Sequence, residues 1–149
     1  MSFMKWDPSF SVGVDVIDNQ HKRIFDYINL LETAVREKDQ SGIKHVLDEM
    51  VDYTLTHFSF EESLMEKGDY PYYDAHKHVH DSFAARVSGY REKFEKGENV
   101  GQRLLSDLRI WLTNHIKRDD GDYAPYVQKT LKKDDAGGWL SKTLKKFFG

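Results

Sequence analysis

The chain has 149 residues, carries a formal net charge of −3 and contains no cysteine. The lack of cysteine excludes disulfides, thiolate nucleophiles, iron–sulfur clusters and cysteine zinc sites. The slightly acidic balance provides no basic field that would attract nucleic acid. The N-terminus shows no signal-peptide pattern, and no stretch approaches the roughly 18 apolar residues of a membrane span. We therefore expect a cytoplasmic protein, large enough to fold as one domain.

Helical periodicity dominates the chain from Ile17 onward. Apolar residues, with histidines among them, recur at steps of three and four residues, which places them in one stripe along a helix. Four such stripes follow one another, at 17–35, 43–64, 76–94 and 104–115. The arm before Ile17 contains Trp6, Pro8 and Gly13 and is expected to be extended.

Short segments rich in glycine, proline and charged residues separate the stripes, at 37–42, 67–71 and 96–101. Each is short enough to join two antiparallel neighbours. No strand pattern competes with the helical one. The sequence therefore predicts an all-α fold, an antiparallel up-down-up-down four-helix bundle with an extended N-terminal arm and a short C-terminal amphipathic tail.

The last part of the chain differs from the rest in charge. We expect the chain to become irregular after Asp120, and we divide it into a bundle domain, 1–126, and a basic extension, 127–149. The extension holds six lysines and two aspartates, so its net charge is +4. The first 126 residues carry −7, and the two parts together give the total of −3. The segment DDAGG at 134–138 is typical of a hinge.

The end of this extension separates apolar from basic side chains at helical spacing. One half of the helix would carry Trp139, Leu140, Leu144, Phe147 and Phe148, and the other half Lys142, Lys145 and Lys146. Such a helix could dock on an anionic membrane surface or on a membrane-bound partner, at the inner face of the membrane. Alternatively, it packs on its own bundle or frays, because so short a helix is marginal alone. The residues leave both alternatives open.

Metal-binding residue types interrupt the apolar stripes. They are His21, His57, Glu61, His76, His80 and His115. His57 and Glu61 are four residues apart, as are His76 and His80, so each pair lies one turn apart on one helix face. Asp120, five residues beyond His115, is expected to curl back from the helix end towards the same centre.

A single histidine on an apolar face is more often a hydrogen-bonded core residue than a metal ligand, but the set as a whole favours a metal site. Five imidazoles and two carboxylates are too many donors for one tetrahedral zinc, and they suit two metals that share bridging carboxylates. His45 and His78 lie about 200° around the helix from their stripes, so we expect both to be solvated.

Four motifs, taken together, resemble the successive signatures of the hemerythrin family, in particular its stand-alone bacterial members. The resemblance spans about residues 6 to 126. The motifs are WDPSFSVGVDVIDNQH at 6–21, HFSFEE at 57–62, HKHVH at 76–80 and WLTNHIKRDD at 111–120.

This resemblance implies a non-haem di-iron centre with an oxo or hydroxo bridge. His76, His80 and His115 would hold one iron, His21 and His57 the other, and Glu61 and Asp120 would bridge them. The second iron would keep an open position for a small molecule. Phe58, Trp111, Leu112 and Ile116 resemble the family's apolar oxygen pocket, a role compatible with core packing. Asp18 occupies a family-typical position and is expected to cap the first helix rather than to bond a ligand.

The function that the resemblance implies is reversible dioxygen binding, for transport, storage or delivery to an oxygen-consuming enzyme. No catalytic residue is expected beyond the ligands, and we expect a monomer that is not an enzyme. An oxygen or redox sensor remains an alternative, as does a peroxide- or nitric-oxide-handling di-iron enzyme.

Overall fold

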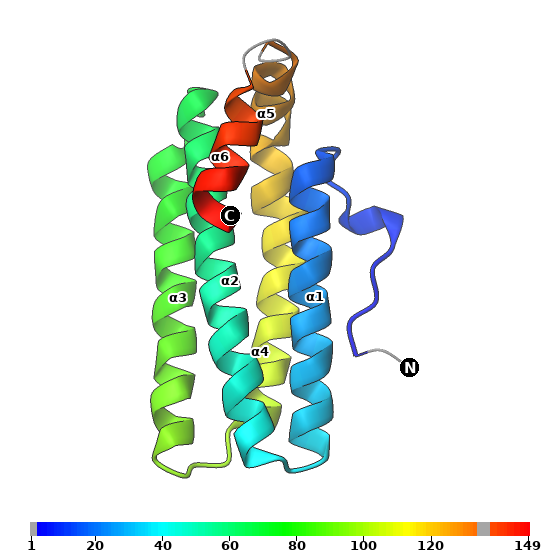
Figure 1. Cartoon of the computed structure of the whole chain (residues 1–149), viewed down its shortest axis with the longest axis vertical. Coiled ribbons are helices and arrows are strands. Elements are labelled where there is room, and N and C mark those ends of the chain that lie inside the picture. The colour runs from blue at the N-terminus through cyan, green and yellow to red at the C-terminus, as the bar shows by residue number, and fades with distance from the viewer. Residues whose placement is uncertain (1–2, 134–137) are drawn as a thin grey trace.

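Four long antiparallel helices form the body of the computed structural model, which describes residues 3–133 and 138–149 (Figure 1). They are α1 (Asp15–Arg36), α2 (Gln40–Lys67), α3 (Tyr73–Glu95) and α4 (Gly101–Asn114). Every regular element of these described ranges is helical. The predicted all-α bundle and its four stripes are confirmed.

The apolar core lies in two clusters with a polar layer between them. The larger cluster fills the body of the bundle and includes Ile24, Phe58 and Leu112. The smaller one, here called the end cluster, lies where α1 begins and α2 ends, and consists of Val14, Ile17, Phe60, Leu64, Met65, Tyr70, Tyr123, Ala124 and Val127. Histidines and carboxylates occupy the stripes between the two clusters, so the metal-binding residue types form a layer across the bundle.

Tight turns return the chain at both ends of α2. Lys38, at φ 55°, and Asp69, at φ 53°, adopt the left-handed conformation that ends a helix. Asp39 caps α2, because its Oδ1 accepts a hydrogen bond from the backbone N–H of Gly42 at 3.0 Å. The turn at Asp69 brings the start of α3 beside the end of α2, and so brings His76 to Glu61.

The chain is not irregular after Asp120, and that expectation was wrong. The π-helical segment η2 (His115–Asp120) continues α4 and leads directly into α5 (Gly121–Lys133). Buried Tyr123, Ala124 and Val127 hold α5 in the end cluster. Because α5 runs from 121 to 133, it crosses the predicted boundary at 126/127, and the division into two domains stays a prediction. Residues 134–137 of the predicted hinge lie outside the described residues.

The C-terminal helix α6 (Trp139–Phe148) packs along α2 at the end of the bundle that also carries α5 (Figure 1). All five apolar residues predicted for one face are partly buried against the end cluster. Phe147 and Phe148 lie 6.2 and 5.7 Å from the ring of Phe60, and the Lys67 ammonium lies 5.3 Å from the Trp139 ring. Packing on the bundle is the arrangement observed.

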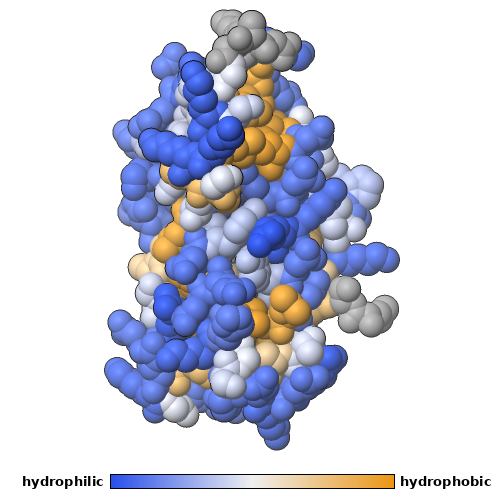
Figure 2. Space-filling view, in the orientation of Figure 1, coloured by the Kyte–Doolittle hydropathy of each residue, from blue (hydrophilic) through white to orange (hydrophobic). Residues whose placement is uncertain are grey.

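The surface around α6 is mixed in character. Hydrophilic side chains cover most of the face seen in Figure 2, and hydrophobic atoms gather beside α6 near the upper end. Within residues 3–133 and 138–149, no helix is both long and apolar enough to cross a membrane.

The N-terminal arm is tied to the bundle by polar contacts and by a short 3-10 turn, η1 (Pro8–Phe10). Asn29 accepts a hydrogen bond from the backbone N–H of Met4 at 2.7 Å and donates one to its carbonyl at 2.8 Å. Asp18 accepts hydrogen bonds from Ser11 Oγ at 2.6 Å and the Val12 N–H at 2.9 Å. Asp18 is therefore not the cap of α1, which begins after Val14; it fastens the arm to the helix.

Candidate metal centre

The seven predicted ligands meet in one layer, near the end of the bundle that carries α5 and α6. The antiparallel arrangement explains this, because α1 and α3 begin at that end while α2 and α4 finish there. All seven residues are at most 5% exposed: His21, His57, Glu61, His76, His80, His115 and Asp120. Residues scattered over a hundred positions in the sequence thus share one buried site.

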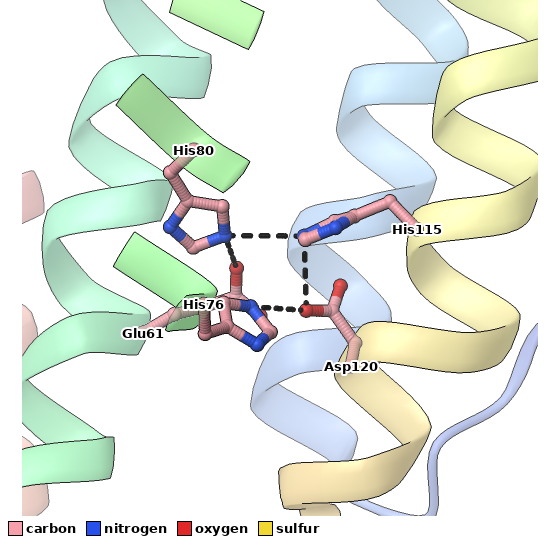
Figure 3. Close-up of side chains that lie close together, drawn as sticks. All are labelled: Glu61, His76, His80, His115 and Asp120. Atoms are coloured by element: carbon pink, nitrogen blue, oxygen red, sulfur yellow. Dashed lines mark hydrogen bonds and ion pairs between the residues drawn. The ribbon is translucent and has the colours of Figure 1, made fainter. Parts of the chain in front are cut away.

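Five of the seven residues form the first donor group: Glu61, His76, His80, His115 and Asp120 (Figure 3). Their donor atoms all lie within 4.8 Å of one another. Oδ1 of Asp120 is 3.1 Å from His76 Nε2 and 3.2 Å from His115 Nε2. This group brings donors from α2, α3 and η2 to one point.

His21, His57 and Glu61 form the second donor group, again with donor atoms within 4.8 Å of one another. Glu61 belongs to both groups, and its Oε1 lies 3.1 Å from His57 Nε2 and 3.5 Å from His80 Nε2. Asp120 also reaches both, because its Oδ2 is 3.1 Å from His21 Nε2. The two carboxylates therefore lie between the two histidine sets, where bridging ligands would lie.

A π-helical turn places His115 and Asp120 on the same face of the chain. In an α-helix, residues five apart point about 140° away from each other. The wider turn of the π-helix brings residues five apart closer to one face, and such turns are frequent at functional sites. Asp120 was expected to curl back from a helix end; instead the helix continues and only its winding changes.

Three side chains that the sequence analysis missed orient the histidine rings. Gln20 Oε1 lies 2.5 Å from His57 Nδ1, Glu62 Oε2 lies 2.9 Å from His80 Nδ1, and Asp119 Oδ2 lies 2.9 Å from His115 Nδ1. An Nδ1–H that donates to such an oxygen leaves the Nε2 lone pair directed at the centre. The available signal was adjacency, since Gln20, Glu62 and Asp119 each stand next to a predicted ligand.

The donor set fits metal cations. Nε2 of His80 and Nε2 of His115 lie 3.1 Å apart, close enough to share one proton or to bind one cation together. Among the described residues, several buried polar atoms of this layer have no hydrogen-bond partner: His21 Nδ1 and Nε2, Glu61 Oε1, His76 Nε2, and both carboxylate oxygens of Asp120. Buried polar atoms that lack a hydrogen-bond partner cost free energy of folding. A cation bound among them would satisfy most of them together.

The electrostatics of the layer also favour positive charge. Burial acts against a charge on His115, but Asp120 and Asp119 outweigh it and raise the pKa of His115 to about 10. Burial likewise opposes ionisation of Asp120, yet His115, His21 and His76 hold the pKa of Asp120 well below its usual value. The carboxylates therefore stay ionised and attract a proton to His115. A metal cation would displace that proton on binding.

Tyr123 is a further neighbour that the sequence analysis missed. Its side chain is fully buried, and its O–H donates a hydrogen bond to Glu61 Oε2. Burial, with the charge of Glu61, raises the pKa of Tyr123 well above its ordinary value. Tyr123 therefore keeps its proton and remains a donor to the carboxylate between the two donor groups.

Two of the four predicted pocket residues stack on histidines of the first donor group. Phe58 stacks on His80 with ring centroids 3.9 Å apart, and Trp111 stacks on His115 at 4.4 Å. Leu112 and Ile116 are buried. Phe58 and Leu112 also line a small apolar cavity of about 20 Å³, to which Trp111 and Ile116 do not contribute.

The two histidines that were predicted to be solvated are at the surface. His45 and His78 are exposed, and His45 pairs with Glu49 on the surface. Helical spacing therefore separated the buried histidines from the solvated ones correctly.

Comparison with known proteins agrees with this geometry. Residues 12–127 match the model of the hemerythrin HHE cation binding domain, so the chain belongs to the hemerythrin family. It is 46% identical to a bacteriohemerythrin of Pseudomonas paraeruginosa and 44% identical to one of Stenotrophomonas maltophilia, over the full length of each chain.

The structure is also similar to a crystal structure of wild-type hemerythrin, with a TM-score of 0.81 and 35% sequence identity. The match covers 85% of this chain and 98% of the hemerythrin chain. The hemerythrin family binds dioxygen at a di-iron site, and its members are oxygen-binding proteins rather than classical enzymes.

Proposed function

We propose that this chain binds dioxygen reversibly at a non-haem di-iron centre. One iron would be held by His76, His80 and His115, and the other by His21 and His57. Glu61 and Asp120 would bridge the two, as their contacts with both histidine sets suggest. Bound ferrous iron would supply the electrons that dioxygen takes up reversibly from the centre.

The observation that carries this proposal is the asymmetry of the two donor groups. The first offers three histidines with the two carboxylates, whereas the second offers two histidines with the same carboxylates. A metal held by the second group would have one protein ligand fewer, and an open position is where a small molecule binds. Imidazole-rich ligation also leaves the irons less electron-rich than carboxylate-rich sites, which favours binding over O–O cleavage.

The surroundings of the second group support a role with a small apolar ligand. The cavity of about 20 Å³ is lined by Ile24, three residues after His21, and by Thr54, three residues before His57. Apart from Thr54, its lining is apolar, including Ile28, Phe58 and Leu112. A dry pocket beside the open position would admit dioxygen while keeping out water and anions that promote oxidation of the iron.

We propose transport, storage or delivery of oxygen as the physiological role. A sensing role is the second candidate, because α6 packs on Phe60, the residue directly before Glu61. In a sensor, ligation at the centre would alter this contact. Hydrogen exchange of α6 in the oxygenated and deoxygenated protein separates the two roles: equal protection supports the carrier.

Optical spectra of the iron-loaded, reduced protein through an oxygenation and deoxygenation cycle test the proposal. We expect a visible charge-transfer band that appears with oxygen and disappears when oxygen is removed. The autoxidation rate, measured in the same sample, should be slow relative to this cycle. Irreversible oxidation at the first exposure to oxygen would contradict reversible binding.

A further inference from the structure

Four tyrosines make a continuous series of ring contacts from the candidate metal centre to the surface. Tyr123 bonds to Glu61, and its ring centroid lies 6.2 Å from that of Tyr70. Tyr70 lies 5.0 Å from Tyr126 and 5.8 Å from Tyr72. Exposure rises along the series, from 0% at Tyr123 through 8% at Tyr70 to 39% at Tyr126 and 67% at Tyr72.

Two separate segments build this series. Tyr123 and Tyr126 come from α5, one turn apart, while Tyr70 and Tyr72 come from the turn between α2 and α3. The series also touches the ligands a second time, because the ring of His76 lies 5.3 Å from Tyr123 and 6.4 Å from Tyr70. Each ring of this series carries a phenol, which can lose an electron and a proton.

We propose that Tyr123, Tyr70 and the surface pair Tyr126 and Tyr72 form an electron relay, which carries oxidising equivalents away from the centre when hydrogen peroxide reacts there. The proposal rests on the di-iron function proposed above. It applies to the oxidised protein, in which both irons are ferric and the next electrons must come from the polypeptide.

The chemistry balances with tyrosine as the electron donor. Hydrogen peroxide takes up two electrons and two protons, its O–O bond breaks, and two waters form. Two tyrosines each lose one electron and the phenolic proton and become neutral tyrosyl radicals. Tyr123 passes its proton along the hydrogen bond to Glu61 Oε2 and recovers it when an electron arrives from Tyr70. The radicals end on the exposed tyrosines, which release their two phenolic protons to solvent, and two protons from solvent complete the waters. A one-electron reductant in solution, such as ascorbate, then returns one electron and one proton to each surface tyrosine.

The relay moves oxidation from residues that the site needs to residues that reductants can reach. Met65 is fully buried in the end cluster, four residues after Glu61, and Trp111 stacks on His115, so both are oxidisable side chains that the relay would spare. A radical on Tyr126 or Tyr72 lies at the surface instead. Phenylalanine at position 70 would keep the packing and remove the middle step.

The test compares wild type with Tyr70→Phe, and with Tyr27→Phe as the matched control. Tyr27, on α1, also belongs to a tyrosine pair, because its ring lies 5.7 Å from that of Tyr53 on α2. This pair is not part of the proposed relay. The iron-loaded ferric proteins are mixed with hydrogen peroxide and a radical trap, and mass spectrometry locates the trapped tyrosines. Freeze-quenched samples without the trap are examined by electron paramagnetic resonance. We expect label at Tyr126 or Tyr72 in wild type and Tyr27→Phe, and its loss in Tyr70→Phe.

A double variant and measurements of iron and folding complete the test. The double variant Tyr72→Phe with Tyr126→Phe should leave a radical signal on Tyr70. Unchanged surface labelling in Tyr70→Phe, or label confined to Trp111, would overturn the relay. Iron content, circular dichroism and the optical oxygen cycle are recorded on the same samples. A protein that cycles oxygen but labels identically in Tyr70→Phe refutes the relay alone, whereas a chain that binds no iron refutes the proposed function and the relay together.

Discussion

Asp120 Oδ1 lies 3.2 Å from Nε2 of His115, although the two residues are five positions apart in the chain. The π-helical turn η2 brings them together and buries both side chains. The residue before Asp120, Asp119, also contacts His115: its Oδ2 lies 2.9 Å from Nδ1, on the other side of the ring. Asp120 is therefore one of the candidate metal ligands, and Asp119 orients the ring of another, His115.

This pair predicts different results for two neighbouring substitutions. Asp120→Asn removes a charged bridging oxygen, and we expect it to lower the iron content of the purified protein clearly below two per chain. Asp119→Asn keeps an oxygen that can accept from His115, so we expect iron to remain bound with an affinity about 10-fold lower, at the mild end for such partners. Iron analysis and competition with a chelator measure both. Equal iron loss in the two variants would contradict the assignment.

Two histidines only two residues apart predict a second contrast. His80→Ala removes a buried donor, so we expect less iron per chain or loss of reversible oxygenation. His78→Ala changes an exposed side chain and should leave the iron content near two per chain. Metal analysis with optical spectra compares them. An effect of His78→Ala as large as that of His80→Ala would overturn the separation of buried from solvated histidines.

The packing of α6 predicts that the tail stabilises the bundle. A chain that ends at Gly137 would expose Phe60 and the rest of the end cluster's outer face. We expect its free energy of unfolding to fall by about 2–4 kcal/mol, since five apolar side chains lose partial burial. Urea denaturation measures the loss, and increased binding of a hydrophobic dye should accompany it. Equal stability would show that α6 contributes little.

The same truncation tests docking on a membrane. Because the apolar residues of α6 face the bundle, docking would require the helix to detach. We therefore expect both the full chain and the truncated chain to stay in the soluble fraction in flotation with anionic liposomes. Recovery of only the full chain with the vesicles would instead support docking through Lys142, Lys145 and Lys146.

The Tyr90–Asp107 contact predicts a pH-dependent contribution to stability. The Tyr90 O–H donates to Asp107, Arg86 lies 2.9 Å from the same oxygen, and together they lower the pKa of Asp107. A lowered folded-state pKa gives stability above the unfolded pKa, and this is lost as pH falls through the folded pKa. Asp107 is 33% exposed, so screening keeps the contribution of this contact to about 1 kcal/mol.

Asp107→Asn should therefore lower the free energy of unfolding of the metal-free protein at pH 7, and the difference should shrink as the pH falls below the ordinary pKa of an aspartate and through the lowered pKa of Asp107. Urea denaturation at several pH values measures it. Asp81→Asn, at an exposed pair with Lys77, is the control and should change the free energy of unfolding much less, because solvent screens this pair. A difference between wild type and Asp107→Asn that is independent of pH would contradict this account.

Much of the site could be predicted from local spacing. His57 and Glu61, or His76 and His80, share a helix face because they are four residues apart, and the same geometry places His78 in solvent. The assignment of Asp18 as a cap was wrong for a reason outside the helix. The carboxylate oxygens of Asp18 accept hydrogen bonds from Ser11 and Val12 in the N-terminal arm. Helical periodicity says nothing about the path of this arm.

The sequence by itself determined which residues face inward, because the 3.6-residue period sorts buried from exposed positions within each helix. Only the tertiary structure decided how the helix after His115 winds, which side chains orient the histidine rings, and where α6 lies. Asp119 and Asp120 are the same residue type side by side, and a π turn assigns one to the donor layer and the other to a histidine ring. Likewise, the apolar face of α6 could meet a membrane or a bundle, and it packs on the end cluster, against Phe60. Such choices depend on contacts between segments far apart in the chain, which local periodicity does not contain.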